Sequence, residues 1–575
     1  MTVAEYIVDF FISKKIFDCF GYQGTMIARL VDAIYKNGKM NNHCCYNEQG
    51  AAFSGVGYAK CSGKVGFVYS TSGPGALNLV SGIADAFYDS VPVVFITGQL
   101  NFTEYTKIPT LRQQGFQETN IVDIVKPITK YSIMIKKEED IVTELSKAYN
   151  MANSGRKGPV LIDLPMDIQK KRIDFDKVKD TINGIEETSY DCSKVNNIVQ
   201  SLNECERPLF VFGNAINLNH IEFELLKDFL ERKHIPFVTS LLKKDLFPTD
   251  FKNNMGIIGS GYGSRSANLI CDCKADLIVS FGCRLCNRQT GSYGIFGKDA
   301  KLIRIDIDEN ELERKINENE EDYKQDCNVI IKKLVHEKGI ISFTDWLDIC
   351  CKIKKRLLDF DDKSNNNLPN QYVCKISSYI SENSNICVDV GQNQMWVARS
   401  FDVKRKQKVL FSGGHGAMGF ALPASIGAYL SNKNNTYVIC GDGGMQMNIQ
   451  ELQTIYREKL PICIFVFNNK SLGLIEQQQD DFFDGNHFGS TDEYGYLSPC
   501  FEKIAKAYGI ESLSINSLTE LDENSKKIFE MKEPLLIEII LPSNTKALPK
   551  TFFGEEPFNQ RPKLPKELLD ELLSL

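Results

Sequence analysis

Short hydrophobic runs alternate with longer amphipathic segments along almost the whole chain. The runs are rich in β-branched and aromatic residues, which is typical of buried strands. The predicted strands cover residues 65–69, 91–97, 159–163, 209–212, 277–281, 302–306, 436–440 and 462–467. The segments between them have apolar positions three or four residues apart, the spacing of a helix that packs on one face. This alternation predicts an α/β protein with three doubly wound parallel-sheet domains.

Two polar stretches divide this pattern into three parts. Residues 170–191 are highly charged without periodicity, and residues 359–370 are rich in asparagine and aspartate, so both are predicted to be linkers. A chain of 575 residues is also too long for a single core. The predicted domains are residues 1–170, 190–345 and 368–545, followed by a tail, residues 546–575. The tail contains several prolines and ends in a short amphipathic helix.

Composition excludes several classes of function. The net charge is −7 and no basic stripe is present, so nucleic acid is not expected as a partner. The first 17 residues have an apolar stripe but include Glu5 and Asp9, which predicts an amphipathic helix rather than a signal peptide. The chain has no apolar run of 18 residues, so no membrane span is predicted. The 18 cysteines lack metal-site spacing and are expected to be thiols of a reduced, cytoplasmic protein.

The most informative chemistry follows the last two predicted strands. Residues 436–440 run into Gly441-Asp442-Gly443-Gly444, and residues 462–467 end at Asn468-Asn469. If the two strands are neighbours in a parallel sheet, their ends place a carboxylate and an amide oxygen at one point, which suits a hard cation. Glycines there let the backbone approach a diphosphate. Either motif alone is more often a turn or a polar loop, but their combination favours a site.

The sequence also predicts where two helices begin near these motifs. Asn448 and Glu451 predict a capping box for a helix over residues 448–458. Glu48 stands at the entry of a helix predicted over residues 49–62. For an isolated glutamate, the ordinary explanation of that position is interaction with the helix dipole.

A series of further motifs changes the interpretation of Glu48. In chain order they read NEQGAA, TSGPG, GIADA, GFQE, GPVLIDLPMDIQ, IDID, DVGQNQMW, GGHGAMGFALPA, GDGG and NN. The chain thereby resembles, over about residues 1–545, the acetohydroxyacid (acetolactate) synthase-like enzymes that depend on thiamine diphosphate (ThDP). The resemblance implies a pyrimidine-binding, a central and a diphosphate-binding domain, the fold type of the ThDP-dependent decarboxylases and synthases. It also implies a homodimer or homotetramer, with the active site between the first domain of one subunit and the third of another.

The resemblance assigns roles to individual residues. Glu48 matches the glutamate that hydrogen-bonds the aminopyrimidine and promotes removal of the C2 proton. Asp442, Asn469 and the backbone carbonyl of Ser471 match the Mg²⁺ ligands. Met418 matches the apolar residue that keeps the cofactor bent, although a methionine in a helix is more often plain core. The other expected cofactor contacts are Gly24, Pro74, Asn78, Gly391, Gln392, Asn393, Gly416, Gly441, Gly443, Gly444, Leu472 and Gly473.

The reaction implied by the resemblance begins with a 2-oxo acid, which we expect to be pyruvate. The enzyme decarboxylates this donor and transfers the acyl carbanion to an acceptor carbonyl, while Phe116 and Gln117 match residues at the substrate. Two alternatives stay open. One is a non-oxidative 2-oxo acid decarboxylase that releases an aldehyde, and the other is a non-catalytic homologue that only binds the cofactor.

The acceptor side departs from the synthase pattern. Thr25 replaces a glycine, Met166 replaces a lysine, and Gln478, in the polar stretch that begins at Glu476, replaces a tryptophan. Polar pocket groups favour a substrate that pairs with them, so we expect an acceptor that is larger or more polar than pyruvate. The tail is a candidate lid over this pocket.

Flavin adenine dinucleotide (FAD) is left open for the central domain. The block around Arg288 and residues 256–263 resemble parts of the FAD site of the synthases, but Gly213-Asn214-Ala215 lacks its glycine-rich start. Residues 259–263 match the dinucleotide pattern imperfectly and by themselves predict a tight turn.

Overall fold

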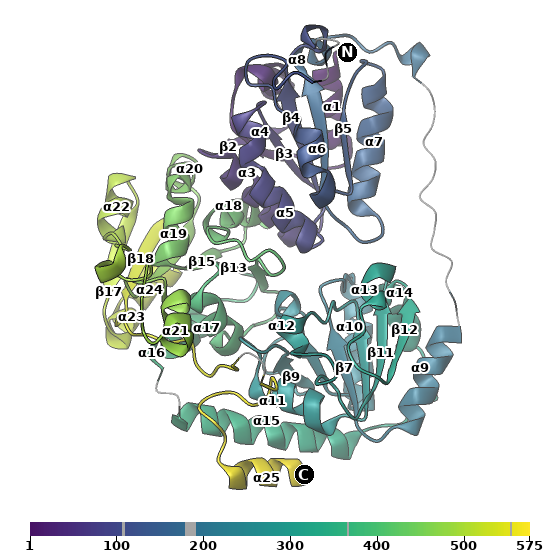
Figure 1. The fold of residues 1–575 in the computed structure, drawn as a ribbon, viewed down its shortest axis with the longest axis vertical. Coiled ribbons are helices and arrows are strands. Elements are labelled where there is room, and N and C mark those ends of the chain that lie inside the picture. The colour runs from purple at the N-terminus through teal and green to yellow at the C-terminus, as the bar shows by residue number, and fades with distance from the viewer. Residues whose placement is uncertain (106–107, 109, 179–190, 192, 365–366, 553–554) are drawn as a thin grey trace. The chain divides into compact units, whose positions relative to one another are not determined.

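The computed structural model describes residues 1–575 except 106–107, 109, 179–190, 192, 365–366 and 553–554 (Figure 1). The described chain contains three six-stranded sheets, and the strand pairs in all of them run parallel. The chain forms two compact units. One comprises residues 1–186, 384–391 and 410–543, and the other comprises residues 187–383, 392–409 and 544–575. The predicted α/β class with three parallel sheets is confirmed.

The first sheet has the order β2-β1-β3-β4-β6-β5. Its strands are β1 (Asp18–Gly21), β2 (Asn41–Cys44), β3 (Gly66–Ser70), β4 (Val93–Gln99), β5 (Tyr131–Met134) and β6 (Val160–Pro165). Every residue of β3, β4 and β6 is buried, which explains why these strands appear in the sequence as continuous apolar runs. The other three are short and partly exposed, and the hydrophobic pattern did not predict them.

Three of the helices around this sheet begin at side-chain caps, given by Thr2, Asn47 and Asn120. The helices of this part are α1 (Val3–Ser13), α2 (Ala28–Asn37), α3 (Glu48–Ser62), α4 (Pro74–Asn78), α5 (Val80–Tyr88), α6 (Ile121–Val125), α7 (Asp140–Asn153) and α8 (Met166–Gln169). The predicted N-terminal amphipathic helix is α1, which starts with a capping box of Thr2 and Glu5. The side chain of Asn47 caps α3 by accepting the N–H of Gln49 at 2.8 Å, which places Glu48 in the first turn.

The third sheet has the order β14-β13-β15-β16-β18-β17. Its strands are β13 (Asn385–Val388), β14 (Lys408–Phe411), β15 (Thr436–Gly441), β16 (Ile462–Asn468), β17 (Glu511–Ile515) and β18 (Leu535–Ile540). The helices of this part are α18 (Ala421–Asn432), α19 (Asp442–Met447), α20 (Leu452–Arg457), α21 (Gly473–Phe482), α22 (Phe501–Ala507), α23 (Leu518–Glu523) and α24 (Ser525–Phe529). Residues 436–440 and 462–467, both predicted as strands, form most of β15 and β16.

Helices α3 and α18 join the first and third sheets within one unit. A β-carbon on Gly57 would collide with the carbonyl of Ala424, and one on Gly427 would collide with the carbonyl of Ser54. The hydroxyl of Ser54 donates to the carbonyl of Pro423 at 2.9 Å. Glycine therefore allows a backbone-to-backbone approach of the two helices. Buried residues of both sheets share one hydrophobic core around this crossing.

The central sheet has the order β12-β11-β10-β7-β8-β9. Its strands are β7 (Pro208–Phe212), β8 (Phe237–Thr239), β9 (Asn254–Ile257), β10 (Leu277–Phe281), β11 (Lys301–Asp306) and β12 (Glu320–Lys324). Its helices are α9 (Ser193–Glu204), α10 (His220–Lys233), α11 (Arg265–Leu269), α12 (Asn287–Thr290), α13 (Glu309–Glu313), α14 (Cys327–Leu334) and α15 (Thr344–Ser364). Helices α16 (Leu368–Tyr379) and α17 (Gln392–Ser400) follow α15 along the chain.

The linker predicted at residues 359–370 is wrong for most of its length. Helix α15 continues to Ser364 and α16 begins at Leu368. Asp361 pairs with Arg265 at 2.8 Å, so this aspartate belongs to a helix that is held by an ion pair, which composition alone does not distinguish from a linker. The other predicted linker, residues 170–191, lies largely outside the described residues.

The C-terminal tail contacts the unit that contains the central sheet. It ends in α25 (Lys566–Ser574), which confirms the predicted short helix. The Arg265 guanidinium donates to the carbonyls of Gln560 and Pro562, and the Asn268 amide donates to the carbonyl of Pro557. A role of the tail as a lid stays a prediction. No helix in the described part of the chain combines the length and apolar character needed to cross a bilayer.

Candidate active site

The carboxyl ends of β15 and β16 bring together the two motifs that the sequence singled out. The strands are neighbours, and Gly441 lies opposite Phe467 in their register. Asp442 is the first residue of α19, and Asn469 follows the last residue of β16. The amide of Asn468 donates to Glu538 at 2.7 Å, so the first asparagine of the pair is engaged inside the fold. Asn469, the next residue, is the one that the resemblance matches to a metal ligand, and this role stays a prediction.

Asp442 has the features of a cation ligand. Its side chain is 3% exposed, and its Oδ2 atom has no hydrogen-bond partner among the described residues. Burial raises the pKa of Asp442 to about 6, against the opposing effects of the Gly443 N–H and of the Tyr496 and Ser498 side chains. A buried carboxylate oxygen without a partner is costly unless a cation meets it. The buried hydroxyl of Ser471 also lacks a partner among the described residues.

The donor types at this edge suit Mg²⁺ rather than a softer metal. Within the described residues, no cluster of three His, Cys, Asp or Glu side chains is arranged to hold a metal ion. The donors here are one carboxylate with amide and carbonyl oxygens. Mg²⁺ accepts few protein oxygens and completes its shell with water and phosphate. The residues present thus fit a magnesium diphosphate.

The glycines after β15 are packed closely against side chains from other segments. A β-carbon on Gly443 would lie 2.7 Å from Cδ2 of Leu472 and 3.1 Å from Cε of Met418. One on Gly444 would lie 2.6 Å from Oδ1 of Asp389. These two glycines therefore have no space for a side chain. The geometry brings together three expected cofactor contacts, Met418, Gly443 and Leu472.

Glu48 lies in a second group of expected site residues, at the first sheet. It is 7% exposed, and its Oε2 accepts a hydrogen bond of 2.9 Å from the amide of Asn78. Its Oε1 is 2.9 Å from the position a β-carbon on Gly75 would take. The α4 segment that begins at Pro74 therefore packs against the carboxylate of Glu48.

The loop that precedes α3 is held by Glu451, a residue whose role the sequence did not predict. Its carboxylate accepts the N–H groups of Tyr46 and Asn47 at 3.0 and 3.1 Å and the hydroxyl of Thr454 at 2.8 Å. Burial raises the pKa of Glu451 to about 7, although these hydrogen bonds oppose the shift. The predicted capping box is wrong. The side chain of Asn448 makes no cap, and the carboxylate of Glu451 instead accepts hydrogen bonds from the two residues that precede Glu48.

Loops at the carboxyl edge of the first sheet also converge. A β-carbon on Gly24 would collide with Thr71, so the Gly24 turn lies against the loop after β3. The carbonyl of Gln117 is 2.6 Å from the β-carbon position of Gly73. Phe116, beside Gln117, is 79% exposed, so its ring projects away from this chain. An exposed aromatic side chain at such an edge suits a contact with substrate or with another subunit.

The residues expected to set acceptor specificity come from separate elements. Thr25 is exposed in a short helical turn after β1, and Met166 is half-buried at the start of α8. Gln478 lies on the exposed side of α21. Glu476, in the first turn of α21, has a buried Oε2 atom without a partner among the described residues. An unpaired carboxylate oxygen on this helix is a polar group that a ligand can satisfy.

Two expected contacts lie at the start of α17. Gln392 and Asn393 are buried, and the amide of Gln392 donates to the carbonyl of Thr545 at 2.9 Å. The side chain of Gln392 is therefore engaged within the protein. Its expected contact with the cofactor stays a prediction.

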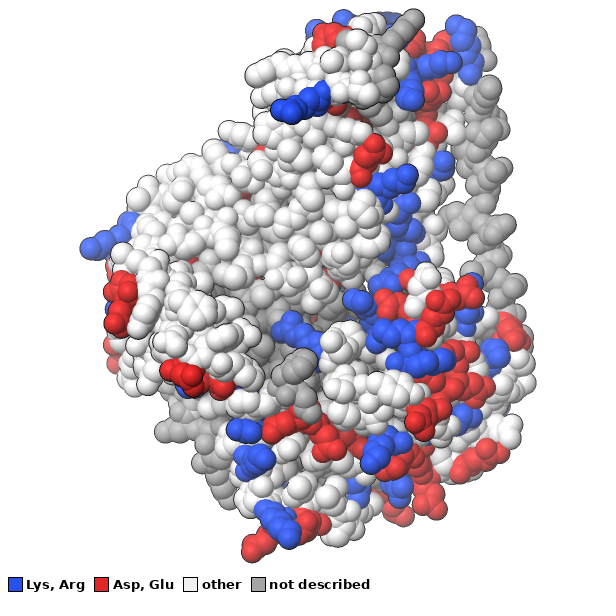
Figure 2. Space-filling model, viewed as in Figure 1, with Lys and Arg blue, Asp and Glu red and all other residues white. Residues whose placement is uncertain are grey.

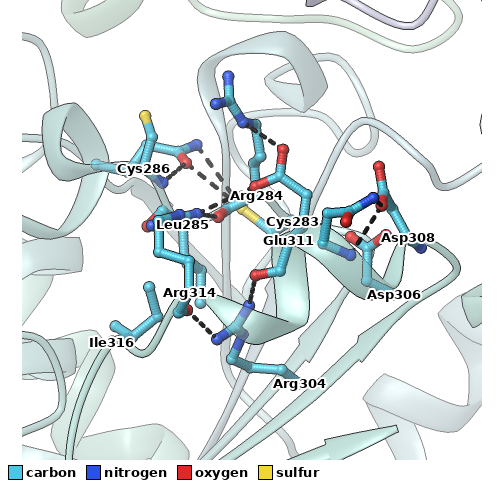
Figure 3. Close-up of polar contacts among 12 residues, drawn as sticks. Cys283, Arg284, Leu285, Cys286, Arg304, Asp306, Asp308, Glu311, Arg314 and Ile316 are labelled. Atoms are coloured by element: carbon cyan, nitrogen blue, oxygen red, sulfur yellow. Dashed lines mark hydrogen bonds and ion pairs between the residues drawn. The ribbon is translucent and has the colours of Figure 1, made fainter. Parts of the chain in front are cut away.

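Two arginines at the carboxyl edge of the central sheet are engaged by the protein itself. The Arg304 guanidinium donates to the carbonyls of Glu311 and Arg314, and Arg314 donates to the carbonyls of Arg284 and Leu285 (Figure 3). These arginines are thus committed to the protein backbone. A β-carbon on Gly213 would collide with the carbonyl of Gly282, so the backbone segments that follow β7 and β10 approach each other closely.

Residues 259–263 form a turn rather than a phosphate loop. The N–H of Gly263 donates to the carbonyl of Gly259 at 3.1 Å, as the sequence predicted for a tight turn. The guanidinium of Arg288 lies over the ring of Tyr262, 5.1 Å from its centre. The contacts of these two blocks are thus with the protein itself.

Comparisons with known proteins agree with this arrangement. Three family models match, described as thiamine pyrophosphate enzyme N-terminal TPP binding domain (residues 1–124), central domain (195–334) and C-terminal TPP binding domain (389–539). A probable acetolactate synthase large subunit of Methanocaldococcus jannaschii is 34% identical over 100% of this chain and 98% of its own. The acetolactate synthase large subunit of Lactococcus lactis is 34% identical over 92% and 91%. The isozyme 2 large subunit of Escherichia coli is 30% identical over 94% and 95%.

Proposed function

Because the chain belongs to the thiamine pyrophosphate enzymes, among the acetolactate synthase large subunits, it is a ThDP-dependent carboligase, and we propose that pyruvate is its donor and Mg²⁺ its metal. The observation that carries the metal proposal is the buried, unpaired Oδ2 of Asp442 at the strand end beside Asn469. Asp442, Asn469 and the carbonyl of Ser471 are the proposed ligands. The decarboxylase alternative is not favoured by the similarity to synthases.

The proposed roles of the residues follow from their positions. Bound ThDP supplies the electron sink for decarboxylation and acyl transfer. Glu48 holds a proton at the aminopyrimidine and transfers it in general acid–base catalysis, with Asn78 fixing the carboxylate. Gly443 and Gly444 let the diphosphate approach the backbone. Met418 supports the bent cofactor, and Phe116 and Gln117 contact the substrate in the assembled site.

The remaining cofactor contacts stay proposals on the same basis. They are Gly24, Pro74, Asn78, Gly391, Gln392, Asn393, Gly416, Gly441, Leu472 and Gly473. The domain boundaries 1–170, 190–345 and 368–545, with a tail from 546 to 575, are also retained as a proposal. No flavin is included, because the polar groups at the central edge are bonded to the protein itself. A flavin band in the absorbance spectrum of the purified protein would contradict this part.

We propose a homodimer or homotetramer in the cytoplasm. Figure 2 shows a wide face, over the elements of the first and third sheets, on which charged side chains are sparse. The unit with these sheets also exposes large apolar side chains, among them Tyr46, Leu77, Phe116 and Met447. Charge-poor surface with exposed apolar side chains supports self-association. The cysteines of the described residues are all free thiols, which supports a reducing compartment.

The metal proposal is tested by cofactor binding. We expect wild-type protein to bind ThDP with Mg²⁺ and to lose that affinity when the metal is chelated. Asp442→Ala removes the buried carboxylate and should weaken ThDP binding about a hundredfold. Asp140→Ala, an exposed aspartate at the start of α7, serves as the control and should bind normally. Titration calorimetry gives both affinities, and metal-independent binding by wild type would exclude the proposal.

A further inference from the structure

The loop that carries Met418, residues 412–419, is held by carboxylates that the proposed mechanism does not use. This Met418 loop connects β14 to α18 and has no regular secondary structure over most of its length. Asp85 and Asp89, at the end of α5, both face it and are both buried. Asp85 belongs to the GIADA motif, to which the sequence gave no role, and Asp89 follows it four residues later.

Asp89 fixes the start of the Met418 loop. Its carboxylate accepts the N–H groups of Gly413 and Gly414 at 3.1 and 2.6 Å. Lys60 of α3 lies 2.6 Å from the same carboxylate and also donates to the carbonyl of Phe411. Where β14 ends, Asp89 thus accepts hydrogen bonds from two backbone N–H groups, and Lys60 donates one to a backbone carbonyl. Charge-assisted hydrogen bonds of this kind are among the stronger ones in proteins.

Asp85 acts further along the same loop, through Ser412. The hydroxyl of Ser412 donates to Oδ1 of Asp85, and the N–H of Ala417 donates to that hydroxyl at 2.9 Å. This chain of two hydrogen bonds ends one residue before Met418. The other oxygen of Asp85, Oδ2, is buried without a partner among the described residues.

The far end of the loop is fixed by Asp389, at the end of β13. Its carboxylate accepts the N–H groups of Gly419 and Ala421, each at 2.9 Å. Met418 therefore lies between two anchored segments, and its Cε is 3.1 Å from the β-carbon position of Gly443. A shift of the Ser412 end would move the thioether relative to the diphosphate glycine.

Electrostatics around Asp85 favour its protonated form near neutral pH. Burial raises the pKa of Asp85 to about 7, with Asp89 and Asp389 adding to the increase while Lys60 and Ser412 oppose it. The Met418 loop itself contains the titratable side chain of His415, which stacks on Tyr88 of α5 with ring centres 5.8 Å apart. Two buried carboxylates thus share one lysine, and a second negative charge on Asp85 is unfavourable.

We propose that Asp85, Asp89, Lys60 and Ser412 form a clamp of positioning residues that holds the Met418 loop in the geometry that supports the cofactor. The inference rests on the proposed function, since the role of Met418 belongs to it. The proposed mechanism gives none of the four a role at the reacting atoms. They act through the backbone of the loop, and misplacement of a supporting group by about 1 Å is enough to slow catalysis strongly.

A double-mutant cycle distinguishes positioning from general stability. We expect Ser412→Ala and Met418→Ala each to lower kcat about tenfold. If Ser412 acts through Met418, the double variant is also about tenfold slower, and not about a hundredfold as independent effects would give. Ser425→Ala is the matched control, because Ser425 is equally buried in α18 and donates only to the carbonyl of Leu422. That variant should keep wild-type kcat.

The outcomes separate this inference from the proposed function. A double variant slowed by the product of the two single effects overturns the clamp, while wild-type turnover and ThDP binding leave the function intact. Loss of kcat in Ser425→Ala to the same extent also overturns it, because the effect would then be one of packing. Absence of ThDP binding by wild type would instead overturn the function.

The pH profile gives a second test. Asp85→Asn keeps the shape of the protonated acid and cannot ionise. Because burial, together with repulsion by Asp89 and Asp389, disfavours ionised Asp85 despite its hydrogen bond from Ser412, the clamp predicts that wild-type kcat falls as pH rises through about 7, while Asp85→Asn loses this decline. The ratio of variant to wild-type kcat should therefore increase between about pH 6 and pH 8. A constant ratio overturns the role of Asp85.

Discussion

Gln478 is the residue whose identity bears most on the acceptor. It lies on the exposed side of α21, where the synthases that the chain resembles have a tryptophan, and the buried Oε2 of Glu476 is one turn away or less. Gln478, Glu476 and Thr25 make the proposed acceptor pocket more polar than an apolar wall would, whereas Met166 adds an apolar side chain. A pocket of this kind favours an acceptor that can form hydrogen bonds.

Substitution Gln478→Trp tests this residue-scale proposal. We expect the variant to use pyruvate as acceptor about tenfold better relative to a polar carbonyl acceptor, because the indole removes polar groups that only the latter satisfies. Competition between the two acceptors, followed by mass spectrometry of the products, gives the ratio. Gln200→Trp, on the exposed side of α9, is the control. An unchanged ratio in Gln478→Trp would rule out the proposed pocket.

Individual residues of the candidate site differ in how far the sequence could predict them. Asp442 and Asn469 could be predicted because each follows a long apolar strand, and strand order then fixed their proximity. Glu451 could not, since its partners are backbone N–H groups of Tyr46 and Asn47, which are far from it in sequence. The residues that neighbour Glu451 in the sequence cannot indicate that its side chain binds backbone N–H groups about 400 residues earlier in the chain.

At the scale of elements, His43 of β2 joins two parts of one unit. Its ring nitrogens lie 2.7 Å from Glu458, just after α20, and 2.9 Å from Asp18 of β1. Burial alone would lower the pKa of His43, but its hydrogen bonds to both carboxylates outweigh burial and raise it. The same contacts lower the pKa values of Asp18 and Glu458 despite their burial.

This cluster predicts a pH-dependent stability. A raised histidine pKa contributes stability that is fully present below the ordinary value of about 6.5 and is lost as pH rises through the folded-state pKa. His43→Gln should therefore cost about 1–2 kcal/mol of unfolding free energy near pH 6 and less near pH 9. Urea unfolding at both pH values measures this difference. The exposed His220→Gln at the start of α10 is the control, and an equal loss at both pH values would contradict the account.

Elements differed in how far sequence could predict them. The buried central strands, such as β4 and β16, were visible as continuous apolar runs. Edge strands such as β2, with polar residues on a short segment, were not. The end of helix α15 was predicted as a linker because its aspartate-rich sequence has the composition of one. Tertiary contacts, here between Asp361 and Arg265, decide such cases.

At the scale of the whole molecule, the order of motifs along the chain indicated the family, and full-length similarity to acetolactate synthase large subunits confirms it. The three parallel sheets follow from the alternation of strands and helices. The clamp on the Met418 loop could not be predicted, because it joins α5 to residues far along the chain through side chains that sequence patterns treat as ordinary. The proposed subunit assembly is what would complete the site.

The most direct measurement of the central claim is product analysis with pyruvate, ThDP and Mg²⁺, alone and with a polar carbonyl acceptor, for wild type and Glu48→Gln. We expect wild type to release CO₂ and to form a ligation product, acetolactate or its counterpart with the added acceptor. Glu48→Gln should lose about a hundredfold or more of this rate, because it cannot carry the proton. Release of acetaldehyde without any ligation product, or undiminished turnover by Glu48→Gln, would contradict the account.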